Sequence, residues 1–390
     1  MLATYPSDIP LHGGQRRVHA IAESFIDAGW EVRHFSAFPQ GSYSTSAASS
    51  DHVLIPRDFI NRIIASRQRA DLHASLYFSE NPEAQARLAE SIIRYRPHAV
   101  TLEQPWLFPV LRNLVDSASQ SFLLINSTQN VEHELMAAIL RQENHPRIEE
   151  WVAATAQLEQ LVSSAADLTI CVTERDADHF RAMGARSITI APNGAARRPA
   201  TVVSTWHATL AGRPYAFMTG SAHPPNCTGF LDLLGAQFAF LPRKGKLVVA
   251  GGMASLLARS RDFQVNQDLV ARRVVLVPQP TEADLDHLIN QANVVILPIR
   301  QGGGSNIKTA EALLSDRPII GTTTAFRGYE EFLTAPGVRV ADDSGRYQHL
   351  VRQALEKNER VSFSRPASER LLWKNCVGHL PAVVRSLLQR

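Results

Sequence analysis

Three consecutive glycines stand between a fully apolar run and a predicted helix in the second half of the chain. They are Gly302, Gly303 and Gly304, and Ser305 follows them. Because glycine has no Cβ, a ligand can approach this backbone closely and a positive φ costs little. Ser305 is the expected N-cap of the helix, whose first N–H groups and positive dipole end attract anions. A glycine loop that enters a helix in this way is typical of a phosphate-binding site.

Two residues of opposite charge follow on the same predicted helix. Lys308 and Glu311 are three positions apart, so they share a helix face. An ammonium group suits a phosphate, and carboxylate oxygens suit the hydroxyls of a sugar. The simpler alternative is a flexible connector followed by a surface ion pair, because a glycine loop before a helix is a weak signal alone.

The elements that must hold this loop follow a pattern that occurs twice. Short apolar runs ending in Gly, Pro or Asn alternate with longer stretches of helical period, which predicts an α/β fold with two doubly wound parallel sheets. The expected strands of the first half are residues 1–5, 31–35, 99–103, 122–126 and 168–172. Those of the second half are 215–219, 246–250, 274–277, 294–297 and 319–321. Expected helices include 15–28, about 133–164, 174–183 and a last helix after Pro366 that is interrupted at Pro381.

A hinge is expected at residues 191–200, which carry two prolines and a glycine and fit neither period. The predicted domains are two Rossmann-like domains, residues 1–195 and 196–365, and a C-terminal helix, 366–390, that crosses back toward the first domain. Sheets of this design bind ligands beyond the carboxyl ends of their strands, where the strand order reverses. With two such sheets, we expect the deepest crevice to lie between them.

Composition narrows the class of protein. The chain has 390 residues, 45% of them hydrophobic, and its 40 Lys and Arg nearly balance 37 Asp and Glu. A net charge of +3 gives no argument for nucleic acid as a partner. The cysteines, Cys171, Cys227 and Cys376, have no paired spacing, so neither a disulfide framework nor a zinc site is expected. Without a membrane-spanning run or a signal peptide pattern, the expected location is the cytoplasm.

An amphipathic basic pattern runs through residues 57–69, where Phe59, Ile60, Ile63 and Ile64 lie beside Arg62, Arg67 and Arg69. We favour an outer helix that packs its apolar stripe on the first sheet, because most amphipathic helices do that. The alternative is a weak peripheral contact with an anionic membrane or a lipid diphosphate at the inner membrane face. Farther along, Glu282, Asp284 and Asp286 are interpreted as a solvated helix start.

The glycine segment also carries a family resemblance. Residues Gly302-Gly-Gly-Ser-Asn-Ile-Lys-Thr-Ala-Glu-Ala312, with Pro318-Ile-Ile-Gly-Thr322 and Gly328 behind them, match a G-x-G-x-x-x-K-x-x-E-A block and its following strand. The sequence thereby resembles retaining glycosyltransferases of the GT-B architecture and is similar to glycosyltransferase family 4 (group 1). Supporting matches are Tyr5-Pro6 with Gly13-Gly14, Asn130-Val-Glu132, Pro192-Asn-Gly194, and Gly220-Ser221 with Pro225-Asn226.

The resemblance implies transfer of a sugar from a UDP- or GDP-linked donor on the second domain to a glycan, lipid-linked or small-molecule acceptor on the first. It implies no other cofactor and no metal ion. Lys308 and Glu311 would be the catalytic pair, with Glu311 on the ribose, and Val277 and Pro278 would face the base. The further donor-binding positions would be Gly302, Gly303, Gly304, Ser305, Asn306, Ile307, Gly220, Ser221, Asn226, Gly13 and Gly14. Acceptor-side candidates would be Gln129, Asn130 and Glu132.

The sequence departs from the family pattern at three positions. Gly303 stands where many relatives have a first carboxylate, eight residues before Glu311. The Arg and Lys that often follow the first strand of the second domain are absent from residues 220–226, which leaves Lys308, Arg300 or His223 to hold the diphosphate. Gln129 replaces a frequent His, so no enzyme base is assigned and the leaving phosphate is expected to accept the proton.

Three alternatives stay open from the sequence. The first is a nucleotide-sugar epimerase of GT-B shape. The second is a non-catalytic nucleotide-sugar binding protein, which the missing carboxylate at Gly303 would suit. The third is a pyridoxal phosphate-dependent phosphorylase, in which Lys308 would have to form the Schiff base.

Overall fold

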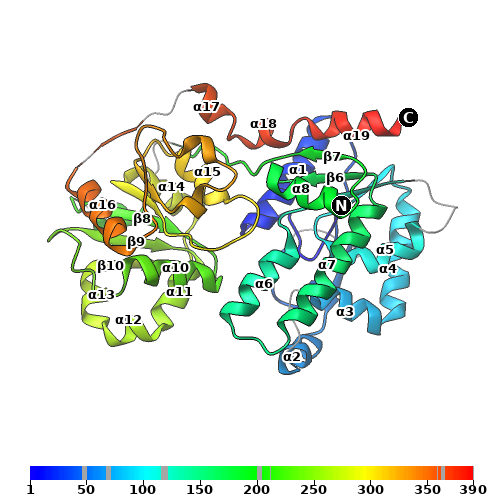
Figure 1. Cartoon of the computed structure of the whole chain (residues 1–390), viewed down its shortest axis with the longest axis horizontal. Helices are drawn as coiled ribbons and strands as arrows, with labels where there is room; N and C mark the ends of the chain where they lie inside the picture. Colours follow the sequence, from blue (N-terminus) through cyan, green and yellow to red (C-terminus); the bar gives the residue numbers. More distant parts are fainter. Residues whose placement is uncertain are drawn as a thin grey trace. The chain divides into compact units, whose positions relative to one another are not determined.

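The computed structural model describes residues 1–45, 51–66, 72–115, 122–199, 204–210, 212–357, 359–361 and 365–389. The chain divides into two compact units (Figure 1). The first comprises Met1–Pro192 and Cys376–Arg390, and the second comprises Asn193–Asn375. The chain therefore leaves the first unit after Pro192 and returns to it at Cys376. The second domain was expected to begin at residue 196, and the C-terminal helix at residue 366.

The first unit is built on a parallel sheet with the strand order β3-β2-β1-β4-β5-β6-β7. Its strands are β1 (Leu2–Ala3), β2 (Phe35–Pro39), β3 (His52–Ile55), β4 (Ala99–Leu102), β5 (Leu123–Ser127), β6 (Leu168–Cys171) and β7 (Ile188–Ile190). Its helices are α1 (Gly13–Asp27), α2 (Arg57–Ala65), α3 (His73–Glu80), α4 (Pro82–Tyr95), η3 (Pro105–Leu107), α5 (Phe108–Val115), α6 (Glu132–Gln142), α7 (Ile148–Ala165), α8 (Glu174–Ala182) and α19 (Leu380–Leu388). The order reverses between β1 and β4.

The second unit has a parallel sheet with the order β10-β9-β8-β11-β12-β13, which reverses between β8 and β11. Its strands are β8 (Tyr215–Thr219), β9 (Lys246–Ala250), β10 (Val274–Val277), β11 (Val294–Leu297), β12 (Ile319–Gly321) and β13 (Val338–Val340). Its helices are α9 (Trp206–Leu210), α10 (Pro224–Leu234), α11 (Gly252–Arg259), α12 (Arg261–Val265), α13 (Gln267–Arg273), α14 (Glu282–Gln291), α15 (Ile307–Leu313), η4 (Thr323–Phe326), η5 (Glu330–Phe332), α16 (Ser344–Glu356) and α17 (Arg365–Glu369), and α18 (Trp373–Val377) spans the return to the first unit.

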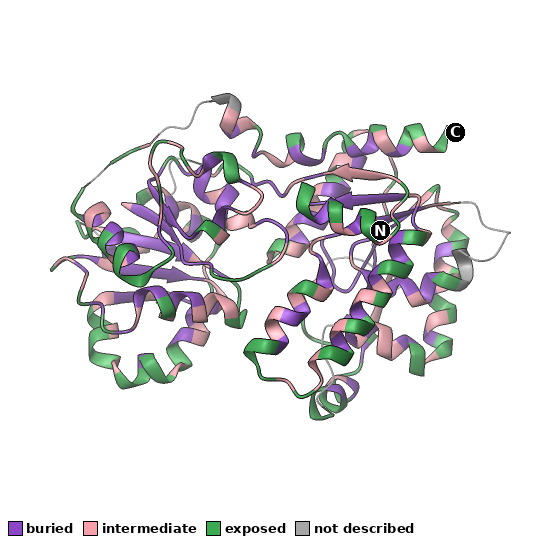
Figure 2. Cartoon of the chain, in the orientation of Figure 1, coloured by how far each residue is buried: buried purple, intermediate pink, exposed green. Residues whose placement is uncertain are grey.

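Strand β11 shows why the central strands are apolar at every position. Val295 and Leu297 pack with residues of α14 and α15, whereas Val294 and Ile296 pack with residues of α10 and α16 on the other face. A parallel strand covered on both faces has no solvent side, so alternation with polar residues is lost. Figure 2 shows this distribution, with buried central strands and exposed outer helix faces.

The first sheet is likewise covered on both faces. Leu2, Val100 and Leu124 pack with residues of α2 to α5. On the opposite face Ala3 packs with Val18 of α1, and α19 contacts α1 (Figure 1). Both sheets are therefore doubly wound, which confirms the predicted fold class. None of the helices in the described ranges is long and apolar enough to span a membrane.

Four expectations about individual elements are wrong. The strand expected at 31–35 lies at Phe35–Pro39, because the backbone of residue 35 is the first to pair with the start of β1. The single helix expected from 133 to 164 is two helices, since Asn144 has a φ of 49° and Pro146 follows it. Pro381 opens α19 instead of interrupting a helix, a position that proline tolerates. The solvated helix start at residues 282–286 is wrong for Asp286, whose ion pair is described below.

The amphipathic segment forms helix α2, which ends at Ala65. Phe59 and Ile63 are buried in the core of the first unit and Ile60 packs against it, as the favoured interpretation expects. Ile64 does not belong to this stripe, because it is 58% exposed. Arg62 pairs with Glu80, with 2.6 Å between Nη2 and Oε2. Arg67 and Arg69 lie outside the described residues.

Candidate functional site

The glycine loop lies at the reversal point of the second sheet. Residues 302–306 lie between β11 and α15, and Gly220 directly follows β8. These two strands are neighbours in the sheet, and the strand order reverses between them. In open parallel sheets this is the position at which ligands bind.

Arg327 fixes the backbone of the glycine loop. Its Nη2 donates to the carbonyl of Gly303 at 2.7 Å, and its Nε donates to the carbonyl of Gly304 at 2.5 Å. Because a trans peptide is planar, the N–H that follows each carbonyl points the opposite way. The amides of Gly304 and Ser305 therefore face away from Arg327, and neither donates to any described residue. Two such amides on a glycine loop suit an anion.

The conformation of this loop explains two of its glycines. Gly302 has a φ of 147° and Gly304 has a φ of 53°, both in the region that other residues avoid. A side chain at either position would strain the loop. The backbone conformation alone therefore requires glycine at positions 302 and 304, independently of any ligand.

Ser305 is not the N-cap of the following helix, which corrects the sequence-based expectation. Helix α15 begins at Ile307, and its N-cap is Asn306, which makes no capping hydrogen bond through its side chain. The Ser305 hydroxyl donates instead to Tyr329 Oη at 3.5 Å, and its carbonyl accepts from Asn193 Nδ2 at 2.9 Å. Ser305 is buried, and Tyr329 Oη donates to the carbonyl of Asn193 at 2.9 Å, so hydrogen bonds join the loop to the hinge segment.

Lys308 lies in the first turn of α15 and is half-buried. Its Nζ donates to Asn226 Oδ1 at 2.7 Å, and Asn226 Nδ2 donates to the carbonyl of Ser221 at 3.0 Å. Burial lowers the pKa of Lys308 to about 8, although the charge of Glu311 acts in the opposite direction. Among the described residues no carboxylate lies within ion-pair distance of Lys308. The cation is therefore held by a neutral amide.

Glu311 has a different surrounding, because it pairs with Arg198 of the hinge segment. Arg198 Nη2 lies 3.1 Å from Glu311 Oε1, and Nη1 lies 2.6 Å from Asp286 Oδ1 and 3.1 Å from Glu282 Oε2. The side chains of Arg198, Asp286 and Glu311 are only 14%, 13% and 11% exposed. The predicted solvated position of Asp286 is thus overturned by this contact.

The remaining donor-side positions lie where β8, β9 and β10 end. The amide of Gly251 donates to the carbonyl of Val277 at 2.9 Å, and the amide of Gly220 donates to the carbonyl of Ala250 at 3.0 Å. A Cβ on Gly251 would lie 2.5 Å from the Gly220 carbonyl oxygen, so these chain segments require glycine to approach so closely. The Val277 carbonyl is engaged, and Pro278 is exposed.

The other candidate cations are placed differently from Lys308. Arg300 donates through Nη1 to the carbonyl of Asp342 at 2.9 Å, and its Nε lies 3.8 Å from Asp232 Oδ2. His223 is the N-cap residue of α10 and is exposed. The backbone amide of His223 donates to the carbonyl of Ser221 at 2.7 Å, whereas Lys308 contacts Asn226 through its ammonium group.

In the first unit, Gly14, Tyr5 and Gln129 come together at the carboxyl end of the sheet. Gln129 Nε2 donates to Tyr5 Oη at 2.5 Å. A Cβ on Gly14 would lie 2.5 Å from Tyr5 Oη and 2.8 Å from Gln129 Oε1, so glycine lets these side chains reach the start of α1. Gly13 is the first residue of that helix, and His12 caps it. Burial lowers the pKa of His12 to about 4, with Arg16 adding to the effect, so His12 is neutral at pH 7.

Asn130 and Glu132 lie at the start of α6. Asn130 Nδ2 donates to Glu132 Oε1 at 3.2 Å. The amides of Glu132 and His133 donate to the buried carboxylate of Glu159 on α7, at 2.7 Å and 3.1 Å. The Glu159 carboxylate therefore caps this helix.

Sequence reasoning missed Arg327, Arg198, Asn193 and Tyr329. Arg327 lies just before Gly328, beyond the strand that follows the glycine segment, and Arg198 lies in the hinge. Arg327 contacts the loop and Arg198 contacts Glu311, both from distant positions in the sequence. A periodic pattern of neighbouring residues could therefore not predict either contact. Asn193 lies in the Pro192-Asn-Gly194 match, which was the one available signal.

A protein-family model matches the part of the chain that contains the glycine loop and Lys308. Residues 213–356, from just before β8 to the end of α16, match the family described as "Glycosyl transferases group 1". This segment is therefore similar to the group 1 glycosyl transferase domain. No curated protein matches the chain.

Several solved structures resemble the whole chain, including the segment that the family model matches. Sucrose-phosphate synthase from Thermosynechococcus elongatus is 15% identical with a TM-score of 0.66, covering 100% of this chain and 98% of that chain. HepE from Anabaena in complex with UDP is 13% identical with a TM-score of 0.66 and 99% coverage of both chains. WaaG, a glycosyltransferase involved in lipopolysaccharide biosynthesis, is 15% identical with a TM-score of 0.55, covering 100% of this chain and 98% of that chain. The chain therefore has the GT-B fold.

Proposed function

We propose that this protein is a glycosyltransferase that moves a sugar from a UDP- or GDP-linked donor to a glycan, a lipid-linked acceptor or a small molecule. The observation that carries the proposal is the pair of amides at Gly304 and Ser305, followed by Lys308, within a group 1 glycosyl transferase domain. These donors face no anion among the described residues. A diphosphate supplies the complementary charge.

Each part of the donor has a proposed partner in the second unit. The diphosphate binds the two amides and Lys308. The ribose hydroxyls bind Glu311, whose carboxylate Arg198 holds in place at 3.1 Å. The base packs near Pro278, which is exposed, because the Val277 carbonyl already accepts a hydrogen bond.

The proposed reaction retains the configuration of the anomeric carbon and uses no metal ion. The bond from that carbon to the phosphate oxygen breaks, the acceptor oxygen bonds to the same face, and the leaving phosphate accepts the acceptor's proton. Negative charge grows on the phosphate in the transition state, so fixed donors at this position accelerate the reaction. Lys308 and the loop amides take that role.

The missing first carboxylate requires another contact to the sugar. The Gly303 carbonyl is bound by Arg327. Asn306 Nδ2 is buried and has no partner among the described residues, so it is the side-chain donor that the loop offers to the sugar. On the first unit, Gln129, Asn130 and Glu132 are the proposed acceptor-side groups.

A thermal-shift screen of nucleoside diphosphates with the full chain tests the proposal. A ligand that binds only the native state raises its Tm. We expect UDP or GDP to raise the Tm and Lys308→Gln to reduce that shift. UDP is the first probe, because HepE was solved with UDP, with UDP-glucose, and with UDP and glucose. A folded protein whose Tm responds to no nucleoside diphosphate would contradict the proposal.

A product assay separates transfer from the other activities that this fold allows. Incubation with the donor that the screen identifies, with and without candidate acceptors, should give an acceptor-dependent glycoside with the donor's anomeric configuration by NMR. An epimer of the donor formed without acceptor indicates an epimerase. Tight donor binding with no product across acceptors indicates a binding protein.

A further inference from the structure

A pocket lies at the end of the second sheet where the strands begin. The glycine loop lies at the other end of the same sheet. The volume of the pocket is about 410 Å³, within the range of small-ligand sites. Arg213, Asn293 and Arg317 line it, and they directly precede or lie two residues before β8, β11 and β12. The glycine loop and Lys308 follow the carboxyl ends of the strands. The two sites are therefore separated by the length of the sheet.

The pocket contains a buried arginine without a counter-charge. The Arg317 residue is only 2% exposed, and its Nε has no hydrogen-bond partner among the described residues. It forms no ion pair with any described carboxylate. Burial lowers the pKa of Arg317 to about 10, and the charge of Arg360 adds to this effect. A guanidinium removed from water without an anion is unfavourable, so this site is incomplete as it stands.

Two further arginines add positive charge without neutralisation. Arg213 and Arg360 line the pocket, are exposed, and pair with no described carboxylate. The amide of Val361 donates to the carbonyl of Asp316 at 3.3 Å, which holds the chain of Arg360 next to Arg317. The described lining contains no Asp or Glu. Asp316 lies beside Arg317 in sequence, and its charge has the smallest effect among those acting on that arginine.

Hydrogen bonds and a ring contact connect the elements that frame this pocket. Asn293 Oδ1 accepts from the amide of Tyr215 at 3.1 Å, and Asn293 Nδ2 donates to the carbonyl of Lys357 at 3.3 Å. The rings of His207 and His287, which also line the pocket, meet edge to face with centroids 5.6 Å apart. The strands and the chain after α16 thus hold the arginines around one space.

We propose that this pocket binds a small phosphate-bearing anion, either free phosphate or a phosphate monoester. Three guanidinium groups and two imidazoles suit a dianion with several acceptor oxygens, and guanidinium groups match phosphate geometry. The site is independent of the donor site, so it does not rest on the proposed transfer reaction.

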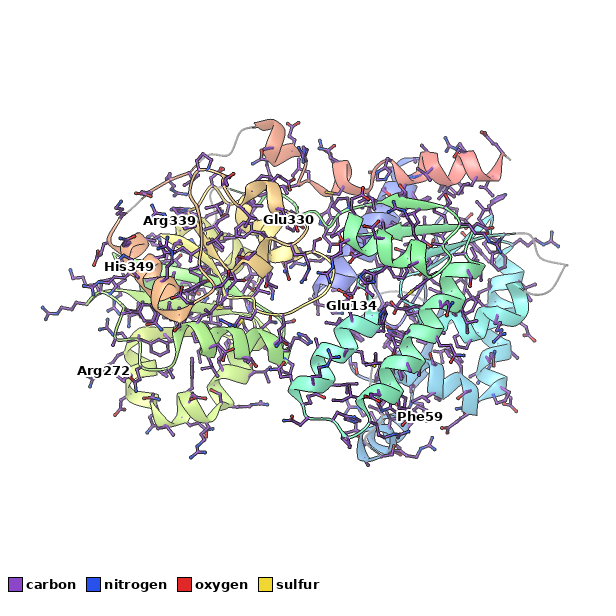
Figure 3. All side chains as sticks on the ribbon, in the orientation of Figure 1. Phe59, Glu134, Arg272, Glu330, Arg339 and His349 are labelled. Carbon is purple, nitrogen blue, oxygen red and sulfur yellow. The ribbon has the colours of Figure 1, made fainter. Side chains whose placement is uncertain are left out.

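Calorimetric titration of the full chain with inorganic phosphate and with glycerol 1-phosphate tests this site. We expect both probes to bind wild type, and Arg213→Gln/Arg360→Gln to weaken binding by about tenfold or more, because charge-assisted contacts are lost. Arg272→Gln should bind as wild type does. Arg272 is an exposed arginine outside the pocket, labelled in Figure 3. Tighter binding of glycerol 1-phosphate identifies a phosphate ester as the preferred ligand, and equal binding identifies free phosphate.

A stability comparison at the buried arginine gives a second test. Because an unpaired buried charge is unfavourable, Arg317→Met should have a Tm equal to or above that of wild type in phosphate-free buffer. Inorganic phosphate should raise the Tm of wild type and not that of the variant. If Arg317→Met does not fold, the titration of Arg213→Gln/Arg360→Gln with phosphate still tests the proposal. Phosphate binding that is as tight in the double variant as in wild type, or that is lost only in Lys308→Gln, would overturn the proposal.

Discussion

The two ends of the second sheet hold arginines in opposite electrostatic states. At the carboxyl end Arg198 is surrounded by the carboxylates of Glu282, Asp286 and Glu311. At the amino end Arg317 is more deeply buried and pairs with no described carboxylate. A cation that the chain itself neutralises can orient other groups, whereas a cation left without an anion favours binding one from solution. Lys308, held by an amide, belongs to the second kind.

The largest expected effect is on turnover at Lys308. Lys308→Gln should lower kcat by about 100-fold, the scale of losing one donor at a developing charge. Steady-state kinetics with the donor identified by the thermal-shift screen measure this effect. Arg213→Gln, at the other end of the sheet, should keep the wild-type kcat. Equal losses in the two variants would remove the distinction between the ends.

A smaller effect is expected on nucleotide affinity at Glu311. Glu311→Gln should weaken UDP binding by about 1 to 3 kcal/mol, because charge-assisted hydrogen bonds to the ribose are lost. Glu282→Gln is the matched control, since Glu282 also pairs with Arg198 but is 68% exposed. Calorimetric titration with UDP distinguishes the two variants. A Glu311→Gln variant that binds UDP as tightly as wild type removes Glu311 from the ribose.

The stabilities of the two arginine sites should differ in sign. Arg198→Gln leaves Asp286 and Glu311 without their shared cation, so the free energy of unfolding should fall by about 1 to 3 kcal/mol. Arg317→Met removes an unpaired charge and should leave that free energy within about 1 kcal/mol of wild type, or raise it. Urea unfolding in phosphate-free buffer compares them. Equal destabilisation by both changes would show that Arg317 has an internal partner.

The smallest expected effect is a pH dependence at Lys308. Burial lowers the pKa of Lys308 to about 8, so the ammonium group loses its proton as the pH rises from 7 to 9. Binding of a diphosphate favours the charged form and takes up a proton, so UDP affinity should fall several-fold over this range. Lys308→Gln should lack this dependence. An identical pH profile in both proteins would place the diphosphate away from Lys308.

The sequence located the apolar strands of the second sheet, including its edge strand β10, but it misplaced the interior strand β2 and missed three of the four edge strands. All five strands expected in the second half are present with the predicted bounds, because buried parallel strands are short, apolar and ended by glycine or proline. The strands β3, β7 and β13 were not expected. Each lies at a sheet edge with one unpaired side, and most of its residues are not fully buried. The fourth edge strand, β10, was expected because Val274–Val277 is apolar at every position.

The same contrast holds for the candidate site. Lys308, Asn226 and Ser221 are joined by hydrogen bonds, and the sequence marked all three through the glycine segment and the start of the second domain. Arg327 and Arg198 were not marked. They contact the loop and Glu311 from segments 23 and 113 residues away, and such pairings follow from the fold and not from any local pattern.

A crystal structure of the full chain with UDP would show directly how the donor is bound. The diphosphate should lie within hydrogen-bond distance of Lys308 Nζ and of the amides of Gly304 and Ser305. Arg327 should still hold the carbonyls of Gly303 and Gly304. UDP bound elsewhere, with these two amides and Lys308 left without a phosphate oxygen, would contradict this proposal.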